Sequence, residues 1–422
     1  MSGRPKRKAV TDTEVRAKKL RGETDLTDGL RWVNIADNYN GRSGGDEDSP
    51  VIALISATLE GSSKVAGFDI DFTVIKTASG RTFATGSNDW VFWDDKVPGR
   101  LRELHKDGYR VVFFTNQAGI EKKKVTPESF KNKIEDIIKK LEIPVLVFAS
   151  TGTNNYRKPY TAMWDHFLDN YNGGVKVDKS ESIYVGDAAG RKKGWAKDKP
   201  KDFSCSDRMF AANIGVKFST PEEFFLNEPP APFEWRSLDP RSFLQANTPI
   251  PKDKDKTTYA IKKQEVVIMV GAPASGKSTF RKRYLEPHGY VAVNRDTMGT
   301  VEKCLKVAKE ALTAGKSVVA DNTNSSVDAR AKFIKLAQEK GVPCRCFWLQ
   351  TPLELAHHLN LFRQNQTNGE VRRIPDVGYN MFKKNFEEPQ ASEGFTGGIV
   401  KIDFKPRFDS KADEELFKQW TV

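Results

Sequence analysis

The segment Phe68-Asp69-Ile70-Asp71 places two carboxylates two residues apart, directly after a short apolar run. Paired carboxylates at the end of a strand can divide the work of phosphate-ester hydrolysis. One attacks phosphorus and forms an aspartyl-phosphate, while the other protonates the leaving oxygen and then activates water. Asp69 and Asp71 are therefore candidate catalytic residues for this chemistry.

A phosphatase site of this kind also needs Mg²⁺, a further carboxylate and donors to the transferred phosphoryl group. Asp187 follows a strand candidate at residues 182–186 and supplies the carboxylate. The candidate donors are Thr115 and Asn116, which close another strand, and Lys158. The D-x-D pair alone is a weak signal, because many caps and loops contain it. Four elements in this order, three of them at strand ends, favour a phosphatase.

Residues 271–278 match the pattern G-x-x-x-x-G-K-[ST] and directly follow the buried run Val266–Val270. Glycines in such a loop let backbone N–H groups wrap a phosphate, the lysine neutralises the β- and γ-phosphate oxygens, and the hydroxyl holds Mg²⁺. The motif predicts binding of ATP with Mg²⁺. The expected nucleotide-binding residues are Gly271, Ala272, Pro273, Ala274, Ser275, Gly276, Lys277, Ser278 and Thr279.

Three further residues could complete a kinase site. Asp321 follows an apolar run, in the place where a carboxylate would ligate or order Mg²⁺. Asp296 follows another strand candidate and suits a general base for a hydroxyl acceptor. Arg363 lies in a helical run, where a lid cation could stabilise the charge of the γ-phosphate. Each has a plain structural alternative: the aspartates could cap helices, and the arginine could lie on a solvated helix face.

Alternating strand and helix patterns must position these residues. Continuous apolar, β-branched or aromatic runs predict buried parallel strands at residues 65–70, 109–115, 144–149 and 182–186, and again at 266–270, 290–293, 317–320 and 345–349. Amphipathic stretches between them predict helices, such as Thr126–Leu141 with Thr126 as its cap, and residues 279–285. We expect an α/β protein of two doubly wound parallel-sheet domains.

Composition shifts divide the chain into a basic tail (1–28), a phosphatase domain (29–228), a proline-rich linker (229–258) and a kinase domain (259–422). Six of the 21 prolines lie between residues 229 and 251, which is typical of a linker, although its aromatic residues indicate packing on a domain surface. The tail holds eight Lys and Arg residues within residues 1–22. We expect it to be disordered and to carry a bipartite nuclear-localisation signal, with loose nucleic-acid binding as the alternative.

The composition of the 422 residues argues against several classes of protein. No apolar run approaches the roughly 18–20 residues that span a bilayer, and no signal peptide opens the chain, so a membrane or secreted protein is not expected. The 4 cysteines and 5 histidines lack the spacing of a disulfide framework or a zinc site. The net charge of +12 favours a polyanionic partner.

The same residues resemble a known family. The sets Asp69-x-Asp71-x-Thr73, Thr115-Asn116, Lys158 and Gly186-Asp187 are similar to the four motifs of the haloacid-dehalogenase-like (HAD-like) phosphatases. The flanking residues are more specific, and they resemble the bifunctional polynucleotide kinase 3′-phosphatases of eukaryotes. They are segments 65–69, 115–119, 156–159, 163–166, 186–191, 201–207 and 221–225, followed in the P-loop half by 294–297, 321–324 and 341–346.

That resemblance, which covers roughly residues 50–400, implies a DNA end-healing enzyme. It would remove 3′-phosphates and phosphorylate 5′-hydroxyls with ATP at nicks, gaps or breaks. Asp69 would be the nucleophile and Asp71 the acid/base, with Asp207 resembling the second acid of the fourth motif. The implied Mg²⁺ contacts are Asp69, the backbone carbonyl of Asp71, Asp187, Ser278 and Asp321, and Asp296 would activate the 5′-hydroxyl.

The chain departs from the family pattern in three places. Vertebrate members carry an N-terminal forkhead-associated domain that binds phosphopeptides, and the short basic segment before the first catalytic strand does not resemble it, so recruitment through phosphorylated repair scaffolds is not expected. Phe72 occupies a position that is often Gly or Trp, which should alter the shape near the leaving group. Leu361 replaces a lid arginine, which leaves Arg363 as the expected lid cation.

Other hypotheses remain open. An RNA end-repair enzyme, or a fusion of small-metabolite phosphatase and kinase, would use the same motifs, whereas a non-catalytic DNA-end scaffold predicts the loss of catalytic residues that are all present. Lysines 192, 193, 197, 199 and 201 could meet a substrate strand or form a solvated insertion. Four aromatic residues could stack on an unpaired base or pack in the core: Trp90, Phe92, Trp93 and Trp195. No heptad run predicts a coiled-coil dimer, and we expect a monomer.

Overall fold

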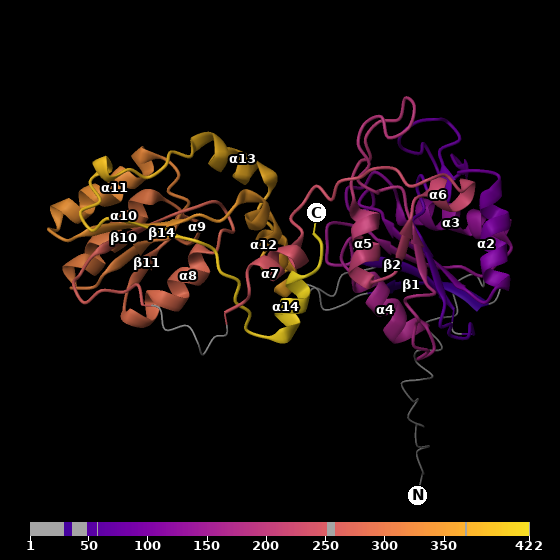
Figure 1. Cartoon of the computed structure of the whole chain (residues 1–422), viewed down its shortest axis with the longest axis horizontal. Coiled ribbons are helices and arrows are strands. Elements are labelled where there is room, and N and C mark those ends of the chain that lie inside the picture. Colours follow the sequence, from indigo (N-terminus) through magenta and orange to yellow (C-terminus); the bar gives the residue numbers. More distant parts are fainter. Residues whose placement is uncertain (1–28, 36–48, 57, 251–257, 368, 422) are drawn as a thin grey trace, which may run out of the picture. The chain divides into compact units, whose positions relative to one another are not determined.

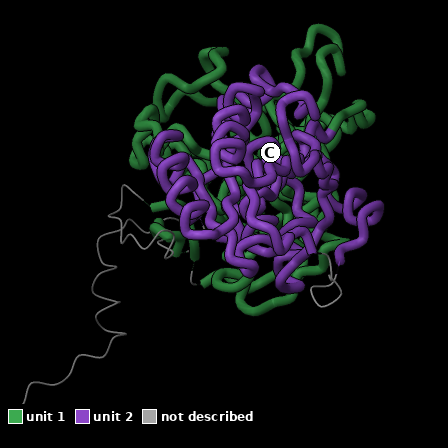
Figure 2. The backbone as a smooth tube through the Cα atoms, turned by 90° about the vertical axis from the view of Figure 1, so that its left-hand side faces the viewer, with its two compact units in different colours: residues 1–234 green, residues 235–422 purple. Residues whose placement is uncertain are grey.

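The computed structural model describes residues 29–35, 49–56, 58–250, 258–367 and 369–421. Its contacts divide the chain into two compact units, residues 1–234 and 235–422 (Figure 2). The basic tail with its predicted localisation signal lies outside the described residues. Among the helices that are described, none is long and apolar enough to cross a bilayer. All four cysteines are buried, and none of them forms a disulfide.

Unit 1 is built on a seven-stranded sheet of order β1-β2-β7-β6-β3-β8-β9. The strands from β7 to β9 in this order are parallel, whereas β2 pairs antiparallel with β7 and β1 pairs antiparallel with β2. The strands are β1 (Leu30–Ile35), β2 (Val51–Ser56), β3 (Val65–Phe68), β6 (Arg110–Asn116), β7 (Leu146–Ser150), β8 (Ile183–Val185) and β9 (Lys217–Ser219), with a separate hairpin of β4 (Ile75–Lys76) and β5 (Val91–Phe92). The helices are α2 (Lys96–Lys106), α3 (Pro127–Leu141), α4 (Ala162–Tyr171), α5 (Ser206–Ile214) and α6 (Pro221–Leu226).

The sheet of unit 1 confirms the predicted parallel strands, which are β3, β6, β7 and β8. The antiparallel strands β1 and β2 and the edge strand β9 were not predicted. Helix α3 also matches its prediction, since the hydroxyl of Thr126 accepts a hydrogen bond from the Ser129 N–H at 3.1 Å. The sequence therefore predicted the centre of the sheet better than its edges.

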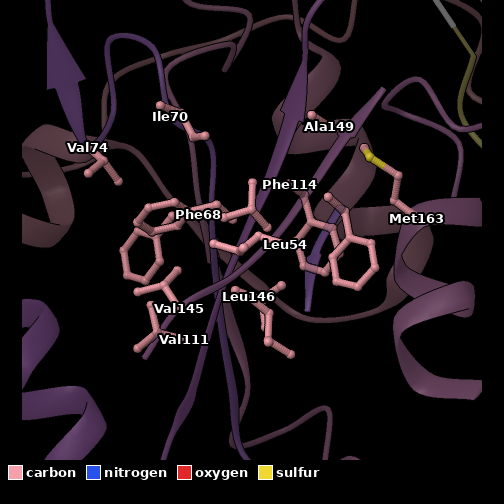
Figure 3. Close-up of a cluster of buried hydrophobic side chains, with 14 of the residues drawn as sticks. Leu54, Phe68, Ile70, Val74, Val111, Phe114, Val145, Leu146, Ala149 and Met163 are labelled. Atoms are coloured by element: carbon pink, nitrogen blue, oxygen red, sulfur yellow. The ribbon is translucent and has the colours of Figure 1, made fainter. Parts of the chain in front are cut away.

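Helices cover both faces of the unit 1 sheet, with α4 and α5 on one side and α2 and α3 on the other (Figure 1). The side chains between these layers form one apolar core, to which Phe68 of β3, Phe114 of β6 and Leu54 of β2 all belong (Figure 3). All three are fully buried. A sheet buried on both faces is stiff, so the residues at its strand ends are held in fixed positions.

The connections of unit 1 place a ligand crevice at the ends of β3 and β8. From β3 the chain runs outward to β6 and β7, and it then returns to β8 on the other side of β3. In open α/β sheets ligands bind at such a reversal of strand order, outside the carboxyl ends of the strands. Asp69 directly follows β3, and Asp187 lies two residues after the end of β8.

Unit 2 contains a five-stranded parallel sheet of order β11-β12-β10-β13-β14. The strands are β10 (Val266–Val270), β11 (Val291–Val293), β12 (Val318–Ala320), β13 (Cys344–Leu349) and β14 (Ile399–Ile402). The helices are α7 (Pro240–Ala246), α8 (Lys277–Tyr284), α9 (Arg295–Met298), α10 (Val301–Thr313), α11 (Val327–Glu339), α12 (Leu353–Gln366), α13 (Asp376–Asn385) and α14 (Lys411–Phe417), with single 3₁₀ turns at Glu286–His288 and Ala391–Glu393. The four predicted strands are confirmed, and β14 was not predicted.

The two faces of the unit 2 sheet bury separate clusters. Val266 and Ile268 of β10 pack with α10 and α11 on one face, whereas Val267 and Met269 pack with Phe280 of α8 on the other. The doubly wound architecture predicted from the sequence is therefore present in both units. The order in which the chain adds strands to this sheet reverses beside β10, because β11 and β12 lie on one side of it and β13 and β14 on the other. The carboxyl end of β10 carries the glycine-rich loop.

Part of the predicted linker packs within unit 2. The ring of Trp235 stacks on Trp420 with ring centroids 4.1 Å apart, and Leu244 of α7 joins a cluster with Leu355 and Phe417. Residues 251–257, which hold the charged end of the predicted linker, lie outside the described residues. The chain from Trp235 to α7 is thus an ordered part of unit 2.

His358 of α12 is a buried imidazole whose pKa links the stability of unit 2 to pH. Its ring is 3% exposed, with Nε2 donating to the Phe417 carbonyl at 2.9 Å and Nδ1 accepting from the Thr421 hydroxyl at 3.0 Å. Burial lowers the pKa of His358 from 6.5 to about 4. Because His358 binds a proton more readily in the unfolded chain than in the folded one, protonation favours unfolding. The contribution of the neutral imidazole to the stability of unit 2 is therefore fully present above pH 6.5 and is lost as the pH falls toward 4.

We expect the free energy of unfolding of unit 2 to fall by about 3 kcal/mol more in the wild type than in His358→Gln across this pH interval. Glutamine can still donate to the Phe417 carbonyl but does not titrate. Urea denaturation of both full chains at several pH values measures the difference. An identical pH dependence in the two proteins would show that His358 is not the linked group.

Candidate active sites

Five side chains converge at the carboxyl ends of β3 and β8. The Lys158 ammonium group lies 2.6 Å from Asp69 Oδ1, 2.7 Å from Asp207 Oδ1 and 2.9 Å from the Tyr184 hydroxyl. Asp69, Asp187 and Asp207 each offer an oxygen within 4.8 Å of the others. Three carboxylates at this spacing fit a divalent cation with hard oxygen ligands, such as Mg²⁺.

Asp207 reaches this site from α5, twenty residues after Asp187 in the sequence, because Gly186 allows close contact. A Cβ atom at Gly186 would lie 2.5 Å from the Asp207 carboxyl carbon, which is too close for any other residue. Asp207 Oδ2 also accepts a hydrogen bond from the Ala188 N–H at 3.0 Å. The loop after β8 and the start of α5 therefore pack tightly together, and between them they carry two of the three carboxylates.

The electrostatics of this site reflect three acids around one cation. Burial raises the pKa of Asp69 to about 7; Lys158 acts to lower it and Asp207 to raise it further. Burial and the charges of Asp207 and Asp69 raise the pKa of Asp187 well above its ordinary value. For Lys158, burial acts to lower the pKa, but Asp207 and Asp69 outweigh it and raise it. A divalent cation among the carboxylates would keep them ionised.

The side chain of Asp71 turns to a second group of residues. Asp71 Oδ2 accepts a hydrogen bond from Gln117 Nε2 at 2.8 Å, and Oδ1 lies 3.4 Å from the Lys133 ammonium group. The Asp71 side chain remains 46% exposed. Phe72, which follows it, has a φ of 61° and a partly exposed ring. This left-handed conformation favours glycine, so Phe72 gives the loop a bulkier and more strained tip.

The two predicted phosphoryl donors of β6 differ in their contacts. The hydroxyl of Thr115 accepts from Gln117 Nε2 at 3.0 Å and lies within the site. Asn116 instead makes two hydrogen bonds to the backbone of Lys158, donating to its carbonyl at 3.2 Å and accepting from its N–H at 2.9 Å. In this geometry the Asn116 side chain positions Lys158.

The lysine-rich segment after Asp187 is anchored by Arg191. This arginine is 3% exposed, pairs with Asp202 at 2.9 Å and with Glu222 at 2.7 Å, and donates to the Asp187 carbonyl at 3.3 Å. Its guanidinium group also lies 3.7 Å from the ring centroid of Trp195. The exposed lysines 192, 193, 197, 199 and 201 are therefore presented by a loop that is fixed at its base.

The glycine-rich loop of unit 2 joins β10 to α8. The Lys277 ammonium group donates to the carbonyls of Gly271 at 2.9 Å and Ala272 at 2.6 Å. Gly276 has a φ of 92°, and no atom lies within 4 Å of the position a Cβ would take. Burial lowers the pKa of Lys277 to about 8, with the charges of Asp321 and Asp296 acting to raise it and Arg363 to lower it. The predicted kinase residues thus lie within electrostatic range of Lys277.

The alternative of helix capping fails for both aspartates of unit 2. The cap of α9 is Asn294, whose side chain accepts from the Asp296 N–H at 2.7 Å, and the cap of α11 is Ser326. Asp296 is exposed within α9. Asp321 is 2% exposed, and its Oδ2 pairs with Arg281 of α8 at 2.9 Å. Arg281 was not anticipated from the sequence.

A cavity of about 660 Å³ adjoins the glycine-rich loop. It is lined by loop residues, including Lys277 and Ser278, by Arg363 of α12 and by the segment after β14. Arg363 donates to Asn360 at 3.2 Å, while its Nε is buried without a hydrogen-bond partner. The volume suits a nucleotide-sized ligand, and the Ser278 hydroxyl lines the cavity as an oxygen donor for an accompanying Mg²⁺, whereas Asp321 is not one of the lining residues.

Comparison with known proteins identifies the family. A family model described as polynucleotide kinase 3 phosphatase matches residues 64–225, and one described as an AAA domain matches residues 266–301 and 298–389. The bifunctional polynucleotide phosphatase/kinase of Schizosaccharomyces pombe is 40% identical over 350 residues, which are 82% of this chain and 81% of that protein. The chain belongs to this bifunctional family.

Two further relatives differ in how much of the chain they match. A protein of Acanthamoeba polyphaga mimivirus is 34% identical over 358 residues, 79% of this chain and 83% of that protein. The polynucleotide 3′-phosphatase of Arabidopsis thaliana is 29% identical over 238 residues, 53% of this chain and 32% of that protein. The similarity to the first of these extends over both units of this family member.

In this bifunctional family member, several side chains that contact the predicted site residues were not predicted from the sequence: Gln117, Lys133 and Tyr184. Gln117 directly follows the Thr115-Asn116 pair, and Lys133 is a lysine on the buried face of an amphipathic helix, which is itself an unusual pattern. Tyr184 gave no sequence signal of its role.

The four aromatic residues proposed for base stacking make contacts within the protein. Trp90 is buried and packs edge-on against Phe92, Trp93 packs against Phe225, and Trp195 lies under Arg191. Among the described residues, the two most exposed aromatic side chains are Phe83, 83% exposed, and Phe203, 96% exposed. Phe203 lies four residues before Asp207, in the segment that borders the carboxylate site.

Proposed function

We propose that this chain is a DNA end-healing enzyme of strand-break repair. Its first unit hydrolyses 3′-phosphates through an aspartyl-phosphate, and its second unit transfers the γ-phosphate of ATP to 5′-hydroxyls. The observation that carries this proposal is the presence of two differently built phosphoryl-transfer sites in one chain of the bifunctional family. The first has carboxylates around Lys158, and the second has Lys277 in a glycine-rich loop.

In the phosphatase reaction Asp69 attacks phosphorus and forms a new O–P bond as the bond to the 3′-oxygen breaks. Asp71 delivers a proton to that oxygen, and it then removes a proton from the water that cleaves the aspartyl-phosphate and releases inorganic phosphate. Lys158 and Thr115 hold the transferred group. A bound Mg²⁺ would supply charge neutralisation at Asp69, Asp187 and Asp207.

In the kinase reaction the 5′-hydroxyl attacks the γ-phosphorus of ATP in line, and ADP leaves. Asp296 accepts the hydroxyl proton. Lys277 exchanges its two loop carbonyls for phosphate oxygens, and the unpaired Nε of Arg363 offers a further donor to the γ-phosphate. Mg²⁺ held at Ser278 and Asp321 would neutralise the charge of the phosphates.

A polynucleotide substrate fits the surface around the first site better than a small metabolite does. The exposed ring of Phe203, four residues before Asp207, is suited to stacking on an unpaired base, and the anchored lysine loop offers charge to the phosphate backbone. The chain as a whole carries a net charge of +12. With its two basic N-terminal clusters, this charge also supports a nuclear location, and we expect the chain to act as a monomer.

The test uses a nicked DNA duplex with a 3′-phosphate and a 5′-hydroxyl at the nick, labelled ATP and Mg²⁺. We expect phosphate release from the 3′ end and label transfer to the 5′ end, both abolished by EDTA. A matched RNA duplex and a small phosphate ester serve as alternative substrates. Rapid hydrolysis of the small ester, with no label on any polynucleotide, would instead identify a metabolite enzyme, and a preference for the RNA duplex would identify RNA repair.

A further inference from the structure

Lys133 is a buried cation in unit 1 to which the reaction described above gives no role. Of the described lysines, only Lys133, Lys158 and Lys277 are buried. Lys158 and Lys277 lie in the two proposed phosphoryl-transfer sites. An ammonium group removed from water is costly unless an opposite charge compensates it. The ion-pair partner of Lys133 is the carboxylate of Asp71, at 3.4 Å. Helix α3 therefore delivers a buried charge to the side chain that acts as acid and base.

Gln117 holds the other oxygen of the same carboxylate. A primary amide has two N–H bonds, and Gln117 Nε2 donates one to Asp71 Oδ2 at 2.8 Å and the other to the Thr115 hydroxyl at 3.0 Å. The backbone of Gln117 is itself fixed, because its N–H donates to the Ser150 carbonyl at 2.7 Å and its carbonyl accepts from Ile120 at 3.0 Å. One rigid residue thus connects two proposed catalytic side chains.

We propose that Lys133 and Gln117 are positioning residues that hold the Asp71 carboxylate in the orientation needed for proton transfer. This inference rests on the proposed phosphatase function. Asp71 lies on a tight loop beside the left-handed Phe72, and nearly half of its side chain is exposed, so contacts on its two oxygens restrict an otherwise mobile group. General acid catalysis depends on hydrogen-bond geometry, and small displacements of the acid are costly.

The chemistry of the leaving group distinguishes positioning from a general structural role. The 3′-oxygen of deoxyribose is a poor leaving group and needs a proton from Asp71 as its bond to phosphorus breaks. An aryl oxygen such as that of p-nitrophenyl phosphate leaves as a stable anion without one. For both substrates kcat/KM reports steps up to formation of the aspartyl-phosphate, so a misplaced Asp71 lowers kcat/KM for DNA far more than for the aryl ester.

We expect Lys133→Met to lower both kcat and kcat/KM on 3′-phosphorylated DNA by about 10- to 100-fold, with KM nearly unchanged. On p-nitrophenyl phosphate the fall in kcat/KM should stay below about threefold. Lys133→Arg should recover most of the DNA activity, and Gln117→Met should show the same discrimination between substrates. Lys131→Met is the matched control, because Lys131 is on the same helix but its ammonium lies over the Trp32 ring.

A double variant tests whether Lys133 acts through Asp71. If it does, Lys133→Met adds no further loss in an Asp71→Asn background. Equal losses on both substrates, additive losses in the double variant, or a higher KM for DNA at unchanged kcat would each overturn the proposal. Failure of the proposed function would look different, since the wild type would then release no phosphate from DNA. A circular dichroism spectrum and a urea unfolding curve like those of the wild type report that unit 1 of each variant is folded.

Discussion

Replacing Asp69 with alanine is expected to lower phosphate release from DNA 3′ ends by at least about 10⁴-fold, while 5′ phosphorylation continues at the wild-type rate. Asp69 directly follows β3, contacts Lys158 at 2.6 Å and lies within the three-carboxylate cluster. Alanine removes the nucleophile, and neither Asp187 nor Asp207 can replace it because both are fixed on the β8 side of the site. The kinase residues belong to the other unit and do not depend on this carboxylate.

The measurement follows both activities on one nicked duplex, with wild type and Asp69→Ala at equal concentration. Acid quenching during turnover of DNA labelled in its 3′-phosphate should leave label on the wild-type protein and none on the variant. Label on Asp69→Ala would place the nucleophile elsewhere. A parallel fall of both activities in a folded variant would mean that the two reactions are not carried by separate sites.

Replacing Lys277 with methionine is expected to lower 5′ phosphorylation by about 10³-fold and to leave 3′-phosphate release unchanged. The Lys277 ammonium group is buried at the base of the cavity and is already directed at two loop carbonyls. Methionine fills a similar volume, so the loop keeps its packing but loses the charge that the phosphates need. The loss should therefore appear in the transfer step as well as in nucleotide binding.

Lys282→Met provides the matched control for this second prediction. Lys282 lies on the same helix and lines the same cavity, but it is exposed and makes no contact with the loop carbonyls described here. Its replacement should change the transfer rate by less than about threefold. If Lys282→Met matched the loss in Lys277→Met, the effect would come from the overall charge of the cavity. Retained transfer in Lys277→Met would contradict the assigned role of the glycine-rich loop.

The parts of the fold that the sequence could predict are those with a strong local signal. Central parallel strands are buried on both faces and appear as continuous apolar runs, so β3, β6 and β10 were predicted with small errors at their ends. Strand direction has no such signal. The fully buried run of β2 resembles any other central strand, yet it pairs antiparallel to β7, because direction is decided by connections and partners.

The sites followed the same rule. Residues at strand ends could be placed together because parallel strands end at one edge of a sheet, which is why Asp69 and Asp187 were linked correctly. Whether a side chain contacts a partner depends on packing that no local pattern encodes. No local pattern predicted that Asn116 would hydrogen-bond the backbone of Lys158, or that Phe83 and Phe203 would be the most exposed aromatic side chains of the described residues.

The anchoring of the lysine loop at its base has a consequence for how this enzyme can evolve. Asp187 and Asp207 are held together by the Gly186 contact and the Ala188 hydrogen bond, and Arg191 closes the loop between them through Asp202 and Glu222. The length, charge and shape of the segment between Asp187 and Asp207 can therefore change while the two carboxylates keep their relative positions. Different contacts thus hold the three carboxylates and the exposed lysines, so the lysine segment can diverge in sequence without moving the carboxylates.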